Sequence, residues 1–500
     1  MFFVIIENIK SISYHMFHKS SYFGSILNKV TPSQSLVDKA PVISRSDRQM
    51  IAVIGAQLGD EGKGRIIDNK LNNLSSEHDE FYVIRSQGGS NAGHTVQIGD
   101  RRIGLHQIPS AVFHQEAKLI LDFGMVIHPE DLLVEIDLVE QMGTSLADRI
   151  FLSQDAMLCT DVERAKEVLN RVINGKAKGG TGRGMSPTTA MRYEKLGLVI
   201  QDLVSENWRE ILTKHYQRFD KLFTVYGEEL SETEVPDFKR TKATGKSHDR
   251  KVGRLEDYLD RLENVRENLT SKKIVVDTFA LDRAIYMETT PVLFEMAQAV
   301  GLSPAFGTRP DTTSTETSSI GITLGTRVFP VSEISERIGV MKATYMSSVG
   351  ARVMPTNLED DWAEWVREFA HEYGTTTGRP RDICAIDLPF LDYNVHVGGI
   401  NQLAMTHLDV SRKNDKIRVC IGYKRDGEEV YYKPDLDYLK GLEPIYVELQ
   451  GWDSDECSSA KDFESLPNEA KKYVNFIESA IGVPVTMLTT GPDRHSLIER

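Results

Sequence analysis

From Gln49 onward, short apolar runs alternate with longer stretches in which apolar residues recur every three or four positions. The short runs predict buried strands, and the longer stretches predict amphipathic helices. The predicted strands are 51–55, 81–85, 118–123, 149–153, 292–297, 339–345, 383–388, 403–410, 416–424 and 485–490, with helices such as 129–142 and 162–173 between them. This alternation predicts an α/β fold with a large, mostly parallel central sheet and helices on both faces.

Two segments depart from this pattern. Residues 1–48 hold only three acidic groups, Glu7, Asp38 and Asp47, among several Ser, Lys and His residues. We expect a poorly ordered N-terminal extension there, with a transit peptide as the alternative. Residues 227–273 are strongly polar, and their second half has apolar residues at helical spacing, which predicts an exposed loop and a solvated helix. A single domain over 49–500 contains the remaining predicted elements.

Composition narrows the range of functions. A hydrophobic content of 40% and a charged content of 26% fit a soluble globular protein. The formal charge of -14 disfavours nucleic acid as a partner, although a local basic pocket for a small anion remains compatible with it. The four cysteines are far apart in sequence, which predicts free thiols and a cytoplasmic location. No apolar run approaches the roughly 18 residues of a membrane span.

The segment IAVIGAQLGDEGKGRIID (51–68) carries the strongest functional signal. A buried strand leads into a glycine-rich turn with a lysine and then into a helix, which is how a backbone forms a phosphate-binding loop. The usual pattern would have glycine at Gln57 and a Ser or Thr hydroxyl at Gly64. Instead, the loop contains Asp60, a carboxylate that can hold a metal ion, accept a proton, or do both. We therefore predict a P-loop-like nucleotide site with altered chemistry.

Four further motifs contain residues suited to phosphate, carboxylate or base recognition. GGSNAGHTV (88–96) places a histidine, the natural proton donor near neutral pH, among glycines. GGTGRG (179–184) and GTTTGRPR (374–381) supply arginines that bind phosphates and carboxylates in bidentate fashion. THLD (406–409) ends a predicted strand with an aspartate that can accept two hydrogen bonds from guanine, and TTGPDR (489–494) follows another strand. Connecting turns, surface loops and a strand-end cap are the structural alternatives for these motifs.

In this order, GAQLGDEGKGRIID, QGGSNAGHT, HQIPS, GGTGRG, FEMAQ, GTTTGR, THLD and TTGPDR resemble the motifs of the adenylosuccinate synthetase family. The resemblance covers about 51–494. It implies a single large α/β domain that works as a homodimer. It also implies the reaction of purine nucleotide biosynthesis in which IMP and L-aspartate are joined with GTP and Mg²⁺. The products are adenylosuccinate, GDP and phosphate.

The resemblance also implies roles for individual residues. Catalysis would rest on Asp60, Lys63, His94 and Gln298, and Mg²⁺ would bind Asp60 and Gly93. GTP would bind Gly59, Glu61, Gly62, Lys63, Gly64, Arg65, Gly93, Thr95, Arg381, His407, Asp409, Thr489 and Gly491. IMP would bind Asn91, Thr181, Gln298, Thr313, Arg379 and Lys195, the last reaching across from the partner subunit. L-Aspartate would bind Thr375, Thr376, Thr377, Arg379 and Arg381.

Three departures from the family pattern leave the acceptor nucleotide open. Residues 299–315 differ from the family, Ser186 replaces a glycine, and His407 replaces a lysine. One alternative is a paralogue that uses dGMP or dIMP with GTP or ATP. Because Asp60 is kept, whereas the dGMP-using branch has a small residue there, IMP or dIMP is favoured over dGMP. A catalytically silent nucleotide-binding regulator and a GTPase-type switch are further hypotheses, which the retained Asp60, Lys63 and His94 disfavour.

Overall fold

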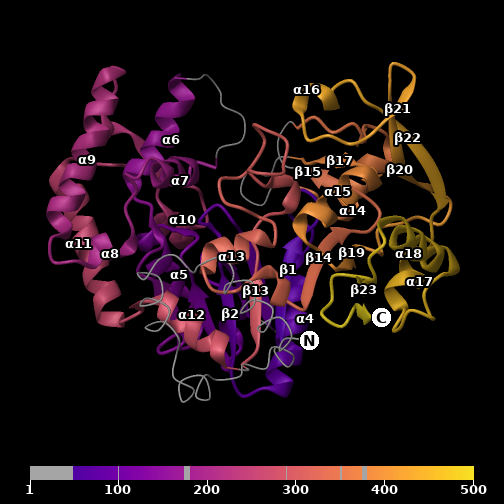
Figure 1. Ribbon diagram of the computed structural model, residues 1–500, viewed down its shortest axis with the longest axis horizontal. Coiled ribbons are helices and arrows are strands. Elements are labelled where there is room, and N and C mark those ends of the chain that lie inside the picture. The colour runs from indigo at the N-terminus through magenta and orange to yellow at the C-terminus, as the bar shows by residue number, and fades with distance from the viewer. Residues whose placement is uncertain (1–48, 99–100, 174–180, 289, 349–351, 374–379) are drawn as a thin grey trace, which may run out of the picture. The chain divides into compact units, whose positions relative to one another are not determined.

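The computed structural model describes residues 49–98, 101–173, 181–288, 290–348, 352–373 and 380–500. The interpretation of 1–48 and the expected ligands Thr375, Thr376, Thr377 and Arg379 lie outside these residues. Element labels are those of Figure 1.

A ten-stranded sheet forms the centre of the fold. Its order is β12 (Val275–Val276), β8 (Ile150–Ser153), β6 (Ala117–Leu121), β2 (Phe81–Arg85), β13 (Val292–Glu295), β1 (Met50–Gly55), β14 (Glu336–Lys342), β19 (Gln402–Thr406), β23 (Val485–Thr489) and β24 (Leu497–Glu499). The described pairs within this sheet are parallel except β23–β24, which is antiparallel. The predicted mostly parallel sheet is confirmed.

The central strand β1 explains why its sequence is continuously apolar. All six of its residues are buried, and it pairs with β13 on one side and β14 on the other. Ile51 and Val53 belong to one hydrophobic cluster, whereas Ala52 and Ile54 belong to another on the opposite face. A strand covered on both faces has no solvent side, so its side chains do not alternate in polarity.

Helices cover both faces of the sheet, as predicted. The first cluster includes side chains of α4 (Lys63–Glu77), α5 (Pro129–Gln141), α6 (Asp161–Ile173), α9 (Trp208–Val225) and α11 (Leu255–Lys272). The second includes side chains of α12 (Thr278–Met287), α13 (Ile320–Thr326), α15 (Leu388–Gly398) and α18 (Asn468–Ile481). In Figure 1, α9 and α11 lie side by side, at the end of the domain away from α17 (Ser454–Ser459) and α18.

The polar segment 227–273 contains more structure than the expected loop. A hairpin of β10 (Glu234–Pro236) and β11 (Asp249–Lys251) encloses α10 (Phe238–Thr244) before α11 begins. Leu230, Val235, Phe238 and Val252 are buried, so four apolar side chains anchor the part of this segment before α11, which the sequence pattern predicts to be solvated. The helical spacing was predicted correctly, but α11 buries its apolar face against α5, α8 (Ile200–Val204) and α9.

Residues 383–388 are not one strand. They divide into β17 (Asp382–Cys384) and β18 (Ile386–Asp387), and α15 begins at Leu388. The division follows from Asp387, whose side chain accepts a hydrogen bond from Phe390 N at 3.1 Å and so caps the helix. The four cysteines are buried free thiols, as expected. Among the described helices, none is long and apolar enough to cross a membrane.

Candidate active site

The predicted site motifs follow neighbouring strands of the central sheet. The phosphate loop follows β1, the 88–96 segment follows β2, Gln298 follows β13, His407 follows β19, and Thr489 ends β23. Because these strands are parallel and adjacent, their carboxyl ends meet at one edge of the sheet. Ligand sites of open α/β sheets lie at that edge. The fold therefore gathers motifs that are far apart in the sequence.

Glu61 organises the phosphate loop from within. Its carboxylate is fully buried and accepts hydrogen bonds from Gln57 N at 3.2 Å and Gly59 N at 2.6 Å. It also pairs with Lys63 Nζ at 2.9 Å. The side chain of Glu61 is thus occupied with the loop itself, and its backbone N–H remains for the expected contact with nucleotide.

Asp60 stands out of the loop because of its backbone conformation. Its φ is 55° and that of the preceding Gly59 is 95°, a left-handed conformation that few residues other than glycine adopt, and Gly62 has a φ of 83°. Gly62 is the N-cap of α4, so the loop amides and the helix N-terminus converge where an anion can bind. The Asp60 side chain is 49% exposed.

Close packing ties the loop to two other motifs. Thr406 Oγ1 donates a hydrogen bond to the carbonyl of Glu61 at 2.6 Å, and a Cβ at Gly62 would lie 3.3 Å from Thr406 Cγ2. On the other side, a Cβ at Gly55 would lie 2.5 Å from the carbonyl oxygen of Gln298. Gly55 is therefore required for space. The phosphate loop lies directly between Gln298 and the end of β19.

His94 faces an acidic group that sequence reasoning missed. It begins β4 (His94–Ile98), and its Nε2 lies 3.7 Å from Glu295 Oε1 at the end of β13. Glu295 in turn accepts hydrogen bonds from Ser110 N at 2.7 Å and Ser110 Oγ at 3.0 Å. Glu295 belongs to the FEMAQ motif and Ser110 to the HQIPS motif, both seen in the sequence, but the pairing of the two residues is a property of the fold.

Burial, assisted by the nearby Arg85 guanidinium, lowers the pKa of His94 to about 3. The imidazole is therefore neutral near pH 7, and its one N–H is engaged in a hydrogen bond to the backbone of Ile108. Burial also raises the pKa of Glu295.

Several buried polar atoms around this edge have no protein partner within the described part of the chain. They are both amide atoms of Gln298, Oδ1 of Asn91, Nε2 of His94 and Nε of Arg381. Gln298 also has a φ of 56°, so a strained backbone holds this unpaired amide in place. Buried polar groups are normally satisfied, and a cluster of unsatisfied groups indicates space for a polar ligand.

Arg381 forms the side of the site opposite Gln298. Its Nη2 lies 2.6 Å from Asp60 Oδ2, and its Nη1 lies 2.7 Å from Glu372 Oε2. The structure thus brings together two residues that the sequence analysis assigned to aspartate binding and to catalysis.

The predicted base-recognition residues also converge. His407 follows β19 with a φ of 57°, and its backbone N–H donates to Thr489 Oγ1 at 3.1 Å. Trp452 Nε1 donates to the carbonyl of Leu408 at 2.8 Å, which fixes the turn from behind. Asp409 is partly buried, and burial raises the pKa of its carboxyl. Gly491 follows Thr489 on the neighbouring strand end.

Other assigned residues lie around this centre. Thr313 is partly buried, and its N–H donates a hydrogen bond to the carbonyl of Leu302. Leu302 lies beside the phosphate loop, since a Cβ on Gly59 would be 3.6 Å from Leu302 Cδ1. Arg65 donates its N–H to the carbonyl of Gly62, and burial lowers the pKa of its guanidinium. Gly93 is exposed. Gly64 lies in the first turn of α4, and Thr95 pairs with Gly104 through β4 and β5 (Arg101–Leu105).

Thr181 and Lys195 are not drawn into the centre by this chain alone. Both are exposed, on either side of α7 (Met185–Tyr193). Met185 packs against Gly89, where a Cβ would lie 2.9 Å from its sulfur, so the start of α7 borders the 88–96 segment. The exposed position of Lys195 is compatible with the expected contact to a second subunit.

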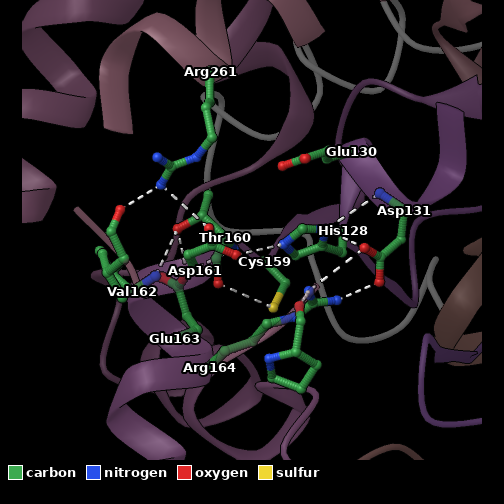
Figure 2. A network of polar contacts seen from close by, with 12 residues as sticks. His128, Glu130, Asp131, Cys159, Thr160, Asp161, Val162, Glu163, Arg164 and Arg261 are labelled. Atoms are coloured by element: carbon green, nitrogen blue, oxygen red, sulfur yellow. Dashed lines mark hydrogen bonds and ion pairs between the residues drawn. The ribbon is translucent and has the colours of Figure 1, made fainter. Parts of the chain in front are cut away.

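A buried charged network lies beside the described part of the GGTGRG turn, residues 181–184 (Figure 2). His128 lies between Asp131 and Asp161, with ring nitrogens 3.2 Å and 3.4 Å from one oxygen of each, and Arg164 pairs with Asp131. Arg183 of the turn lies 3.7 Å from Asp131. Burial would lower the pKa of His128, but the two carboxylates hold this pKa above its ordinary value. The paired charges therefore hold Arg183 of this turn in place.

The donors near Asp60 suit a hard cation. Mg²⁺ prefers oxygen ligands and is commonly bound by one or two carboxylates together with substrate phosphates. Asp60 provides a partly exposed carboxylate within the phosphate loop, and Gly93 is an exposed residue whose backbone carbonyl is a further oxygen of this kind. The residues present therefore fit Mg²⁺.

Comparisons with known proteins agree with this geometry. The sequence model of the family described as adenylosuccinate synthetase matches residues 52–498. The chain is 34% identical over 452 residues to an adenylosuccinate synthetase of Clostridium botulinum (strain Eklund 17B / Type B), covering 89% of this chain and 98% of that protein. It is 36% identical over 451 residues to that of Caldanaerobacter subterraneus subsp. tengcongensis, covering 89% and 98%.

Two solved structures share the fold. A fully ligated adenylosuccinate synthetase from Plasmodium falciparum superposes with a TM-score of 0.78 at 30% identity, over 90% of this chain and 100% of that one. The succinoaminodeoxyadenylate synthetase of cyanophage S-2L, bound to dGMP and dATP, gives a TM-score of 0.53 at 16% identity, over 90% and 95%, which shows the fold alone. The family match over nearly all of the described domain shows that this chain belongs to the adenylosuccinate synthetase family.

Proposed function

We propose that this chain is a GTP-dependent ligase that joins L-aspartate to C6 of IMP, giving adenylosuccinate, GDP and phosphate in purine nucleotide biosynthesis. The observation that carries the proposal is the position of Asp60. This carboxylate stands in the phosphate loop, is partly exposed, and lies 2.6 Å from Arg381, an arginine suited to the carboxylates of L-aspartate. Proton transfer, phosphoryl transfer and amine attack can then take place at one point.

The chemistry requires activation of a poor leaving group, the O6 of a 6-oxopurine. Asp60 would accept the N1 proton, which makes O6 nucleophilic. O6 would then attack the γ-phosphorus of GTP, and GDP leaves with the electron pair of the broken P–O bond. The amine of L-aspartate would next attack C6 and lose a proton, and inorganic phosphate departs with O6.

Charge must be stabilised while the phosphoryl group is transferred. Lys63 and the amides of the loop are suited to this role, because phosphoryl transfer depends on positioning and electrostatic stabilisation. His94 would act as the acid that stabilises charge on the transferring group. Gln298, whose amide has no protein partner, would orient the 6-oxopurine.

Mg²⁺ would be held by the Asp60 carboxylate and the Gly93 carbonyl together with phosphate oxygens. When bound, it neutralises charge on the phosphates.

The remaining assignments complete three binding regions. GTP would extend from the loop to His407, Asp409, Thr489 and Gly491, where Asp409 can accept two hydrogen bonds from guanine. IMP would contact Asn91, Thr181, Thr313 and Arg379, with Lys195 of a second subunit at its phosphate. The threonines 375–377 and both arginines of that loop would hold L-aspartate. We further propose a cytoplasmic homodimer in which residues 49–500 form the catalytic unit and 1–48 form an extension.

A product screen by mass spectrometry tests the substrate. Purified protein with Mg²⁺ and L-aspartate is incubated with each of IMP, dIMP, GMP and dGMP, in combination with GTP or ATP. Adenylosuccinate from IMP and GTP at the highest rate is the expected result. A succino-product from dGMP but none from IMP would contradict the proposal and favour the dGMP paralogue. Tight nucleotide binding without any product would favour the regulatory alternative.

A further inference from the structure

Glu372 is a buried carboxylate that none of the assigned roles uses. It lies between α14 (Asp361–Phe369) and β17, and it accepts hydrogen bonds from Arg381 Nη1 at 2.7 Å, Tyr345 OH at 2.6 Å and Lys342 Nζ. Glu372 and Lys342 are each 1% exposed, and Tyr345 is fully buried. A carboxylate held by three donors from separate parts of the chain has a fixed position.

The charge of Glu372 is also fixed. Burial would raise its pKa, but the Lys342 ammonium and the three hydrogen bonds lower the pKa to about 2. Glu372 is therefore ionised at any working pH and can only accept hydrogen bonds.

Two of its donors lead to opposite ends of the active site. Arg381 binds Glu372 with one guanidinium nitrogen and Asp60 with the other, at 2.6 Å. Tyr345 OH binds Glu372 and also lies 2.7 Å from His407 Nδ1. One carboxylate thus connects the catalytic aspartate, through a single residue, with the residue at the base-recognition end.

The direction of these hydrogen bonds determines which nitrogen of His407 carries a proton. Tyr345 has one hydroxyl proton, and the ionised Glu372 is the stronger acceptor, so that proton goes to Glu372. The hydroxyl oxygen must then accept from His407, which requires a proton on Nδ1. Burial lowers the pKa of His407 to about 4, so the ring carries this one proton near neutral pH. Nε2 is left as an acceptor.

We propose that Glu372 is a positioning residue that orients Arg381 toward Asp60 and, through Tyr345, fixes His407 in the Nδ1–H form, so that His407 Nε2 accepts a hydrogen bond from an N–H of the donor nucleotide base. This inference rests on the proposed function, in which the base of GTP lies beside His407 and Asp409. A lysine ammonium at this position donates hydrogen bonds, whereas His407 accepts one. The substitution changes the polarity of the contact with the base.

Tautomer measurement tests the network without any turnover. Protein labelled with ¹⁵N-histidine is compared with His407→Asn to identify the His407 ring signals. The wild type is expected to show a protonated Nδ1 and an unprotonated Nε2 at pH 7. Tyr345→Phe removes only the hydroxyl and is expected to give a mixture of both tautomers. A wild-type ring protonated on Nε2 would overturn the proposal.

Steady-state kinetics separate the effect of the contact through Tyr345 to His407 from the effect of the contact through Arg381 to Asp60. Tyr345→Phe is expected to raise the KM for GTP about tenfold, with the KM values for IMP and L-aspartate unchanged. Glu372→Gln is expected to raise the KM values for both GTP and L-aspartate about tenfold or more, and Glu372→Asp should recover part of this loss. Glu364→Gln, at an exposed position of α14, and Tyr226→Phe, at an exposed position after α9, are the matched controls, with wild-type constants expected.

The outcomes distinguish failure of the positioning role from failure of the proposed function. Wild-type turnover with unchanged KM values in Tyr345→Phe would overturn the positioning role and leave the proposed function intact. A wild type that makes no product would remove the proposed function, and the tautomer result in Tyr345→Phe would still decide whether the hydrogen-bond network exists. Glu372→Gln could fail to fold because Lys342 loses its carboxylate partner. In that case Tyr345→Phe alone tests the contact between Tyr345 and His407.

Discussion

The carboxylate of Asp60 is paired with the guanidinium of Arg381 at 2.6 Å. Both groups have roles in the proposed reaction, so this ion pair must exchange partners when substrates bind. The carboxylates of L-aspartate can replace Asp60 on Arg381, which leaves Asp60 able to accept the purine N1 proton. In the proposed reaction, the base is thus held in contact with the group that would recognise the second substrate.

Replacing Arg381 with leucine should mainly weaken L-aspartate binding. Loss of a charged hydrogen-bond donor corresponds to roughly tenfold or more in the KM for L-aspartate, and Arg381→Lys should recover only part because it lacks the bidentate fork. Steady-state kinetics with L-aspartate varied and the nucleotides saturating measures this. An unchanged KM for L-aspartate would remove Arg381 from that site.

Asp60→Asn and His94→Asn should each reduce kcat by about 10²-fold or more while nucleotide binding stays close to that of the wild type. Asparagine at position 60 keeps the side-chain size but cannot accept the proton, and asparagine at position 94 is smaller than histidine and removes the imidazole. Turnover measured alongside GTP and IMP binding by calorimetry separates the two effects. Near-normal turnover in either variant would contradict the role assigned to that residue.

The sequence predicted the parts of this fold that depend on local patterns. The continuous apolar run of 51–55 marked a strand buried on both faces, and the glycines after it marked the phosphate loop. Glu372 was not found, because an isolated glutamate carries no local signal and becomes significant only when the fold places it beside Arg381. Glu295 lies in the FEMAQ motif, but its pairing with His94 is visible only in the fold. Buried hydrogen-bond partners depend on contacts between distant segments.

The expectation of an exposed loop in 227–273 missed β10, α10 and β11 because their burial also depends on contacts between distant segments. Val235 and Phe238 are single apolar residues among charged ones, and their burial depends on neighbours from α5 and α6. His407 shows the opposite case. Its place after a strand was readable from the sequence, but its partner Tyr345 and its positive φ were not.

Stability should fall as the pH decreases below about 6.5, in part because of His407. Its pKa in the folded protein is about 4, whereas an unfolded histidine titrates near 6.5, so the unfolded state binds more protons between these values. Each pH unit in this window costs up to about 1.4 kcal/mol of unfolding free energy. Urea unfolding at pH 7, 6 and 5 should show a shallower decrease in His407→Asn than in the wild type.

Asparagine suits this test because it tolerates the φ of 57° at position 407. His371→Asn is the matched control, since His371 has a φ of 54° on an exposed turn. Equal slopes for wild type and His407→Asn would show that the His407 ring does not contribute.

Asp131→Asn should destabilise the domain by about 3–5 kcal/mol, because it leaves the fully buried Arg164 without its carboxylate partner. Asp137→Asn, an exposed position on the same helix α5, should change stability by less than about 0.5 kcal/mol. Chemical denaturation of both variants provides the comparison. Equal stability of the two would show that the network in Figure 2 contributes nothing at Asp131.

Mixing two inactive variants should restore activity if Lys195 acts on the partner subunit. Lys195 is exposed after α7 and far in sequence from the phosphate loop. In a hybrid of Asp60→Asn and Lys195→Ala subunits, one site has an intact Asp60 from one chain and an intact Lys195 from the other. Adenylosuccinate formation should therefore rise after the two proteins exchange subunits, and sedimentation should show a dimer.

A mixture of Asp60→Asn with Lys63→Ala is the control for this experiment. Both residues lie in one loop of one chain, so every site in that hybrid keeps a defect and activity should stay low. Restoration in the control would indicate contamination or residual activity. If the Lys195→Ala mixture remains inactive although hybrids form, Lys195 does not complete the neighbouring subunit's site, and the shared-site dimer is wrong.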